Sequence, residues 1–292
     1  MADSHAAPHH DYHLVDPSPW PLIASIAVTI MMVGAVIWMK GLFGLPQGTP
    51  WVFLGALVVV LYSMGGWWAD VIKESHKGDH TPVVSIGLRY GMVLFIASEI
   101  MFFAAFFWMF FEMAVFNEVR TGTPEIGAWA ETAAAWSTWP PTGVEVLSPW
   151  QLPLLNTVTL LLSGCTVTWA HHALQVGDRK GARLALIITI LLGVFFTAIQ
   201  AYEYNHIIHE NLFFNQEAAN SGLYGSIFFM ATGFHGFHVL VGTIFLTVCL
   251  IRLMAGQFTP EKHFGFEAAA WYWHFVDVVW LFLFAFVYVT FG

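Results

Sequence analysis

Titratable side chains stand inside apolar stretches of this sequence. Glu99 lies within the run 97–103, and His235 and His238 lie within the run 233–238. If these stretches cross a membrane, an ionised side chain near the centre of one costs about 2.5–3.5 kcal/mol, so such residues are usually functional or paired. We therefore expect Glu99 to be protonated or hydrogen-bonded to another helix, and His238 is its candidate partner.

Two roles for Glu99 follow from the residue types. It can handle protons or gate a pathway, or it can form an inter-helix hydrogen bond that only fixes packing. His235 and His238 are three residues apart and share one helix face, where Gly233, Gly236 and Gly242 allow a close neighbour.

Metal binding is a more specific alternative role for His235 and His238, because two histidines at i and i+3 can hold one metal ion. A haem requires an axial histidine from each of two facing helices, and His274 could supply one. No paired spacing favours such a site, and neighbouring His171 and His172 point about 100° apart. We expect no metal in this chain. Asp277, also inside an apolar stretch, must pair or stay neutral.

The composition identifies the solvent as lipid. Of 292 residues, 58% are apolar and only 10% are charged, with a mean hydropathy of +0.66, whereas a soluble domain carries about 25% charged residues. Ten Lys and Arg residues without a basic run exclude a nucleic-acid partner. Cys165 and Cys249 both lie in apolar segments, so we expect buried free thiols.

Seven segments reach the roughly 20 apolar residues that a membrane-spanning helix needs. The fold class is therefore all-α, a polytopic membrane protein. The segments cover residues 20–39, 51–72, 87–117, 151–175, 182–204, 222–254 and 267–291.

The distribution of Lys and Arg predicts the orientation. Eight of them lie on the side of the N-terminus and of the second, fourth and sixth loops, and only Lys40 and Arg120 lie on the other side. The N-terminus is expected in the cytoplasm and the C-terminus outside. At the cytoplasmic ends, Trp68 fits an aromatic belt, while Lys73 and Arg252 either bind a lipid phosphate or extend toward water.

Several stretches resemble cytochrome c oxidase subunit III. They are 17–21, 87–92, 156–157, 169–172, 177–180, 231–238 and, longest of all, 263–280, which reads His-Phe-Gly-Phe-Glu-Ala-Ala-Ala-Trp-Tyr-Trp-His-Phe-Val-Asp-Val-Val-Trp. The resemblance covers essentially the whole chain.

The resemblance implies a V-shaped arrangement of two bundles whose cleft holds phospholipid. Its parts would be a cytoplasmic segment 1–18, a two-helix bundle 19–73, a cytoplasmic linker 74–86 and a five-helix bundle 87–292 with an outer loop 118–150. Glu99 would be the membrane-embedded carboxylate of the third helix. The implied lipid contacts are Trp68, Lys73, Glu74, His80, Phe95 and Arg252.

The role implied is that of a non-redox core subunit in a bacterial inner membrane. The holoenzyme would reduce dioxygen with electrons from cytochrome c and pump protons, with haem and copper in partner subunits I and II. This chain would stabilise subunit I, support proton uptake, bind phospholipid and pass oxygen through the cleft; a respiratory supercomplex is a further partner that the resemblance allows. Subunit III of a quinol oxidase and an independent transporter or channel stay open. A retinal sensor is excluded, because the last segment has no Lys.

Overall fold

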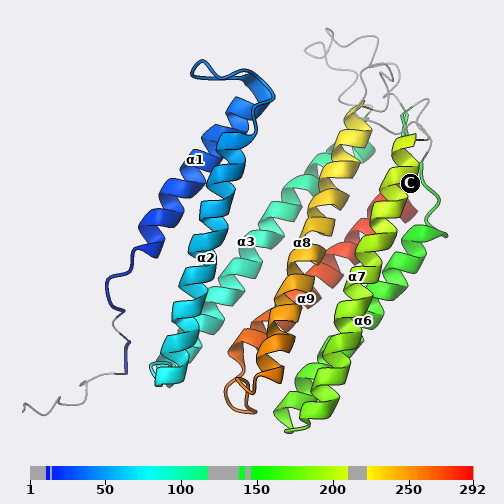
Figure 1. Ribbon diagram of the computed structural model, residues 1–292. Coiled ribbons are helices and arrows are strands. Elements are labelled where there is room, and N and C mark those ends of the chain that lie inside the picture. Colours follow the sequence, from blue (N-terminus) through cyan, green and yellow to red (C-terminus); the bar gives the residue numbers. More distant parts are fainter. Residues whose placement is uncertain (1–10, 14, 118–137, 142–145, 210–221, 292) are drawn as a thin grey trace, which may run out of the picture. The chain divides into compact units, whose positions relative to one another are not determined.

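The computed structural model describes residues 11–13, 15–117, 138–141, 146–209 and 222–291. Within these ranges the chain is helical and contains no extended strand, and seven helices are long and apolar enough to cross a membrane (Figure 1). This confirms the all-α, seven-span prediction. Most of the outer loop 118–150 lies outside the described residues.

The helix bounds follow the chain order. They are α1 (Trp20–Lys40), α2 (Trp51–Lys77), α3 (Pro82–Val115), α6 (Leu152–Gln175), α7 (Arg179–His209), α8 (Gly222–Met254) and α9 (Phe264–Phe282), which continues as the π-helix η2 (Leu283–Thr290). The chain divides into two compact units, Met1–Tyr90 and Gly91–Gly292.

In the first unit, α1 packs along α2. At one end of this pair, the Trp20 indole donates a hydrogen bond to Asp70 Oδ2 at 2.7 Å, and Lys73 Nζ contacts Asp70 Oδ1 at 2.8 Å. Toward the other end, Gly34 lies directly against the backbone of Phe53. The Trp20–Asp70 hydrogen bond and the close contact at Gly34 therefore hold the two helices together.

The connection between α2 and α3 is shorter than the sequence suggests, because most of the stretch 74–86 is helical. Helix α2 continues to Lys77 and ends at Gly78, whose φ of 95° is left-handed and suits glycine. Thr81 then caps α3, since its hydroxyl accepts a hydrogen bond from Val84 N at 3.4 Å. Charged residues here extend the helix beyond its apolar part rather than interrupt it.

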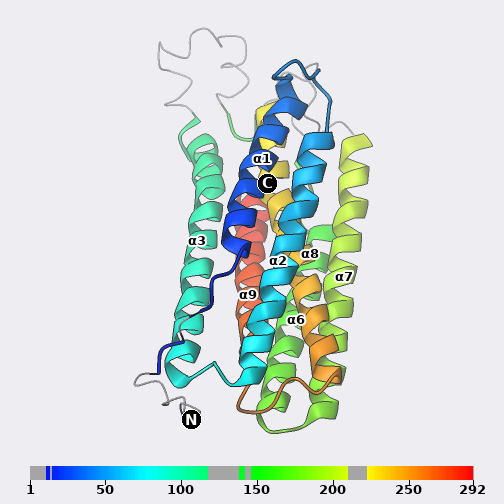
Figure 2. The same ribbon diagram turned by 60° about the vertical axis from the view of Figure 1, so that its left-hand side comes forward.

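In the second unit, α9 supplies the core. It packs on α6 and α8, and α7 packs on both α6 and α8; Figure 2 shows these helices from a second side. Trp273 and Trp280 are fully buried, and their indole nitrogens donate hydrogen bonds to Ser163 Oγ and Thr157 Oγ1, each at 2.9 Å. Two hydroxyl acceptors on α6 thus fix the position of α9.

Helix α3 reaches its neighbours through long aromatic side chains. Phe106 stacks on Phe234 of α8 with ring centroids 5.4 Å apart, and Phe111 meets Phe286 of η2 edge-to-face at 5.2 Å. Rings of this size keep the helix backbones apart while still filling the space between them. Glu99 lies on the same helix, one turn before Phe103.

Candidate functional site

Glu99 and His238 meet between α3 and α8. Glu99 lies at the centre of the span Pro82–Val115, and its Oε2 is 2.8 Å from His238 Nε2. The other ring nitrogen, Nδ1, is 2.6 Å from the carbonyl oxygen of Phe234, one turn earlier on α8. The structure thus brings together the two residues that sequence reasoning paired.

This geometry determines the number of protons. A carbonyl oxygen only accepts, so His238 Nδ1 must carry a proton and donate it to Phe234. One further proton must lie between Nε2 and Oε2, either on the carboxyl group or on the ring. In both arrangements the pair is neutral as a whole, which removes most of the cost of placing a carboxylate in lipid.

Aromatic rings surround the pair. Phe103 meets the His238 ring edge-to-face at 5.0 Å, and Tyr272 of α9 stacks on it at 6.3 Å. The side chains of Glu99 and His238 are only 20% and 10% exposed. The site is therefore an enclosed proton-holding pair with limited access from the surface of the unit.

The other histidines that the structure describes are not grouped as metal ligands. His235 is fully buried, and its Nε2 lies 3.1 Å from the Val276 carbonyl oxygen. The rings of His171 and His263 meet edge-to-face at 5.3 Å. Across the described part of the chain, no three His, Cys, Asp or Glu side chains are grouped as metal ligands would be.

Four of the expected lipid contacts belong to the first unit. Trp68 is exposed, and Lys73 is paired with Asp70. Glu74 Oε2 lies 3.8 Å from His13 Nε2, and His80 is half-buried. Two of the expected charges are therefore already engaged by side chains of this chain.

The remaining two contacts belong to the second unit. Phe95 is exposed and stacks on Tyr272 at 6.2 Å. The guanidinium of Arg252 lies 4.6 Å from the Phe258 ring centroid, and its Nε donates to Gln257 Oε1 at 2.9 Å. Its two terminal nitrogens, which make no hydrogen bond to a described residue, can bind an anionic oxygen.

Sequence reasoning missed two carboxylates and misplaced one thiol. Glu203 of α7 is buried, and its Oε2 has no hydrogen-bond partner among the described residues. Asp70 joins Trp20 to Lys73, as described above. Cys249 is buried as expected, but Cys165 is exposed, because its side of α6 faces away from the bundle. A Glu within the apolar segment 182–204 was the available signal for Glu203.

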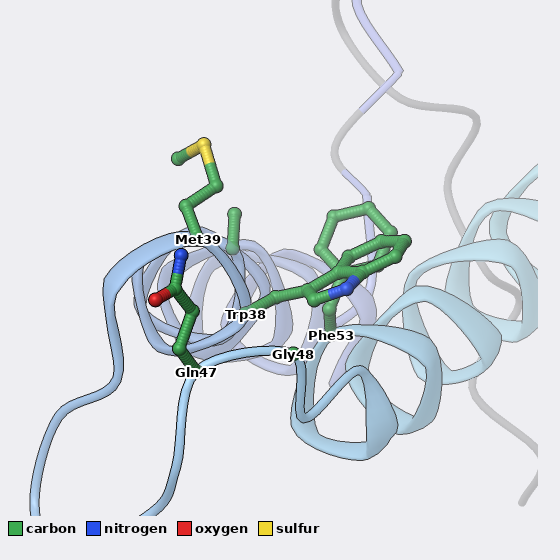
Figure 3. A pocket seen from close by; sticks show the side chains of 6 residues that line it. Trp38, Met39, Gln47, Gly48 and Phe53 are labelled. Carbon is green, nitrogen blue, oxygen red and sulfur yellow. The ribbon is translucent and has the colours of Figure 1, made fainter.

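The first unit also holds a shallow pocket of about 520 Å³ beside the α1–α2 connection (Figure 3). Its walls are Ala35, Trp38, Met39, Gln47, Gly48 and Phe53. The Trp38 and Phe53 rings lie 5.7 Å apart. None of these six side chains is ionisable.

Seven apolar helices with an enclosed Glu–His pair define a polytopic membrane protein. A family model described as cytochrome c oxidase subunit III matches residues 10–291. Proteins named cytochrome c oxidase subunit 3 align over 280 residues and 96% of this chain: Cyprinus carpio at 51% identity (97% of that protein), Marchantia polymorpha at 52% (96%) and Oryctolagus cuniculus at 49% (97%).

The chain belongs to the cytochrome c oxidase subunit III family, as the motifs predicted. It is thereby a component of a multi-subunit oxidase, and its enzymatic activity is that of the complex. The named relatives come from eukaryotes, so they give no support to a bacterial source.

Proposed function

We propose that this chain is the non-redox subunit III of an oxidase that reduces dioxygen to water with electrons from cytochrome c and pumps protons. Support comes from similarity to cytochrome c oxidase subunits over 96% of the chain. Haem and copper would belong to partner subunits I and II. The chain's own residues would stabilise subunit I, hold a proton within the membrane and bind phospholipid.

The Glu99–His238 pair carries the proton-handling part of this proposal. It holds one proton between two acceptors 2.8 Å apart, and the proton can shift from the carboxyl to the ring without changing the net charge. Glu99 is also partly accessible from the surface of its unit. Uptake of a further proton would give the pair one positive charge until a proton is released, so a relay through it requires uptake at one partner to be coupled to release at the other.

Glu99→Gln in the holoenzyme tests this role. The glutamine amide still donates to His238 Nε2, so packing is preserved, but the side chain can no longer ionise. We expect normal assembly together with altered turnover stability or altered proton stoichiometry, measured during steady-state oxygen consumption in proteoliposomes. Ser98→Ala is the matched control, because the Ser98 hydroxyl bonds only to Phe95 O of its own helix. Impaired assembly with normal turnover of the assembled enzyme would show a packing role.

Phospholipid binding is the second part of the proposal. In the second unit, Arg252 offers its terminal nitrogens beside Gln257, and exposed Phe95 offers an apolar surface. In the first unit, Trp68, Lys73, Glu74 and His80 would contact headgroups at the end of α2. An acyl-chain phase dissolves oxygen better than water does, so bound lipid would also give oxygen an apolar path.

Arg252→Ala tests the lipid site. A cationic side chain near an anionic headgroup contributes about 1 kcal/mol, so we expect the variant to bind this phospholipid about fivefold more weakly and to retain less of it on purification. Phosphorus analysis and native mass spectrometry provide the count. Arg252→Lys, which keeps the charge, should retain more lipid than Arg252→Ala. An unchanged lipid count in Arg252→Ala would remove this assignment.

We also propose that the chain lies in a bacterial inner membrane with its N-terminus in the cytoplasm. The excess of Lys and Arg on the N-terminal side supports the orientation. The quinol-oxidase alternative gains no support, because the three relatives compared above are all named as cytochrome c oxidase subunits.

A further inference from the structure

A buried carboxyl group without a partner lies near one end of the second unit. At this end α7 and η2 finish and α8 begins (Figure 1). Glu203, in the last two turns of α7, is only 3% exposed, and its Oε2 makes no hydrogen bond to a described residue. Position 203 also falls within the apolar span Arg179–Ile208, so this carboxyl group does not belong to a solvated loop.

The other carboxyl groups buried in this unit each face a histidine. His238 Nε2 is 2.8 Å from Glu99 Oε2. His274 Nδ1 is 3.7 Å from Asp277 Oδ2. No cationic side chain in the described part of the chain lies at such a distance from Glu203. Burying an unpaired ion costs several kcal/mol, and a bound proton removes the charge, so we expect Glu203 to hold a proton of its own.

Tyr288 brings a second unpartnered group to the same region. It lies on η2, is 2% exposed, and its hydroxyl makes no hydrogen bond to a described residue. Its ring meets Phe228 of α8 edge-to-face at 5.6 Å, and its hydroxyl lies within electrostatic range of the Glu203 carboxyl group. The π-helix that carries it is a rare helix type, found frequently at functional sites. Two buried polar groups from different helices thus lie near each other without a direct hydrogen bond.

The neighbouring Tyr204 does not supply the missing hydrogen bond. The Thr232 hydroxyl donates to the Phe228 carbonyl oxygen at 2.6 Å, so its oxygen must accept the proton of the Tyr204 hydroxyl, also at 2.6 Å. A tyrosine hydroxyl has one proton to donate. The proton of Tyr204 is therefore already engaged, and neither Glu203 nor Tyr288 can receive it.

Short buried side chains of this unit solve the same problem within their own helix. The hydroxyls of Thr157 and Ser163 donate to carbonyl oxygens four and three residues earlier. Glu203 and Tyr288 have longer side chains, which carry their polar atoms away from the helix backbone. They require a partner in the space between the helices.

We propose that Glu203 and Tyr288 form a binding site for internal water, in which Glu203 holds a proton and a water molecule joins its carboxyl group to the Tyr288 hydroxyl. Water both donates and accepts, so one molecule can satisfy both groups. Buried waters typically make about three hydrogen bonds, and Tyr224, which also lies within electrostatic range of Tyr288, can provide a third. This site is separate from the Glu99–His238 pair and does not depend on the proposed function.

Infrared spectroscopy of the holoenzyme tests the proton. The difference spectrum between wild type and Glu203→Gln should contain the carbonyl stretching band of a protonated carboxylic acid, because glutamine lacks this group. The band should shift in D2O, since bound water exchanges the proton. Absence of the band would mean that Glu203 is ionised and would overturn the proposal. A band that does not shift in D2O would show a dry acid and would remove the water.

Radiolytic labelling tests the position of the water. An X-ray pulse converts bound water to hydroxyl radicals, which modify the side chains beside it. We expect Tyr288 to be modified faster than Trp273, which is fully buried, is intrinsically more reactive and has its indole nitrogen bonded to Ser163. Glu203→Leu should lower the Tyr288 rate, because the water loses one partner. Modification of Tyr288 no faster than that of Trp273 would contradict a water at this site.

A sodium ion is the competing occupant, and it would require an ionised Glu203. A bound ion raises the denaturation midpoint by mass action, so sodium and choline buffers would then differ in wild type and not in Glu203→Gln. We expect the difference between the two buffers to be the same in both proteins. A sodium-dependent stabilisation that Glu203→Gln abolishes would replace water by a cation and overturn the proposal.

Discussion

At the residue scale, the membrane-embedded carboxylate is accommodated by sharing its proton. His238 is held by Phe234 O on one side and Glu99 on the other, with distances of 2.6 and 2.8 Å. Because a backbone carbonyl fixes the ring orientation, Nε2 points at Oε2, and the shared proton can move only along this one hydrogen bond. Either partner alone would be a polar group without a match in an aromatic surrounding.

This mutual dependence predicts non-additive stability. His238→Leu should lower the free energy of unfolding by roughly 1–3 kcal/mol, the cost of a buried polar group left unpaired. The double variant Glu99→Leu/His238→Leu should be more stable than His238→Leu alone, because no unmatched group remains. Detergent-denaturation midpoints of the purified chain measure both. Phe237→Leu, on the exposed side of α8, is the control. Additive losses would mean that the two side chains stabilise the fold independently.

Residue types in the sequence predicted side-chain partners where burying an unpaired polar group would cost much free energy. A carboxylate at position 99 demands a partner, and a histidine on an apolar helix is a natural one. Burying the carboxylate of Glu203 has the same cost. This residue lies near a helix end, where a carboxylate could also reach water, so the sequence did not predict a buried site there. The exposure of Cys165 could not be read from an apolar segment, because lipid-facing and core-facing positions have the same hydropathy.

At the element scale, small residues determine which helices can approach closely. A Cβ on Gly34 would lie 2.6 Å from Phe53 N and 2.8 Å from its Cα, closer than van der Waals contact permits. These are backbone atoms and cannot move aside as a flexible side chain can. The crossing of α1 and α2 therefore requires glycine at this position.

Gly34→Ala should destabilise the α1–α2 pair by roughly 1–3 kcal/mol through overpacking. Gly55→Ala on α2 is the matched control, because nothing beyond its own helix backbone lies within 4 Å of its Cβ position, and alanine should be neutral or stabilising there. The rate of proteolysis in the α1–α2 connection, measured in detergent for both variants, reports the separation of the helices. Similar rates would show that this crossing does not limit stability.

At the scale of the whole molecule, an odd number of spans places the two chain ends on opposite sides of the membrane. Within the described residues, seven helices qualify by length and hydropathy. By the order of the spans, eight of the ten Lys and Arg residues are assigned to the N-terminal side, among them Lys77 in the last turn of α2 and Arg252 in the last turn of α8. An oxidase subunit with this charge distribution would be inserted with its N-terminus in the cytoplasm.

Labelling of engineered cysteines tests this orientation. In a background of Cys165→Ser and Cys249→Ala, Ser4→Cys should react with a membrane-impermeant maleimide only in inside-out vesicles. Gly292→Cys should react only in right-side-out vesicles. The reverse pattern would invert the topology, and labelling of both sites from one side would contradict an odd number of spans.

Sequence by itself determined the number of spans, the all-α class and the family. Hydropathy adds up locally over about 20 residues, and lipid leaves an apolar segment little choice but to be a helix. Tertiary structure decided which polar groups meet. His235 and His238 share one face of α8, yet packing directs His235 to the Val276 carbonyl and His238 to Glu99, 139 residues away. Helical periodicity relates residues within one helix, but the relative placement of two helices depends on every side chain between them.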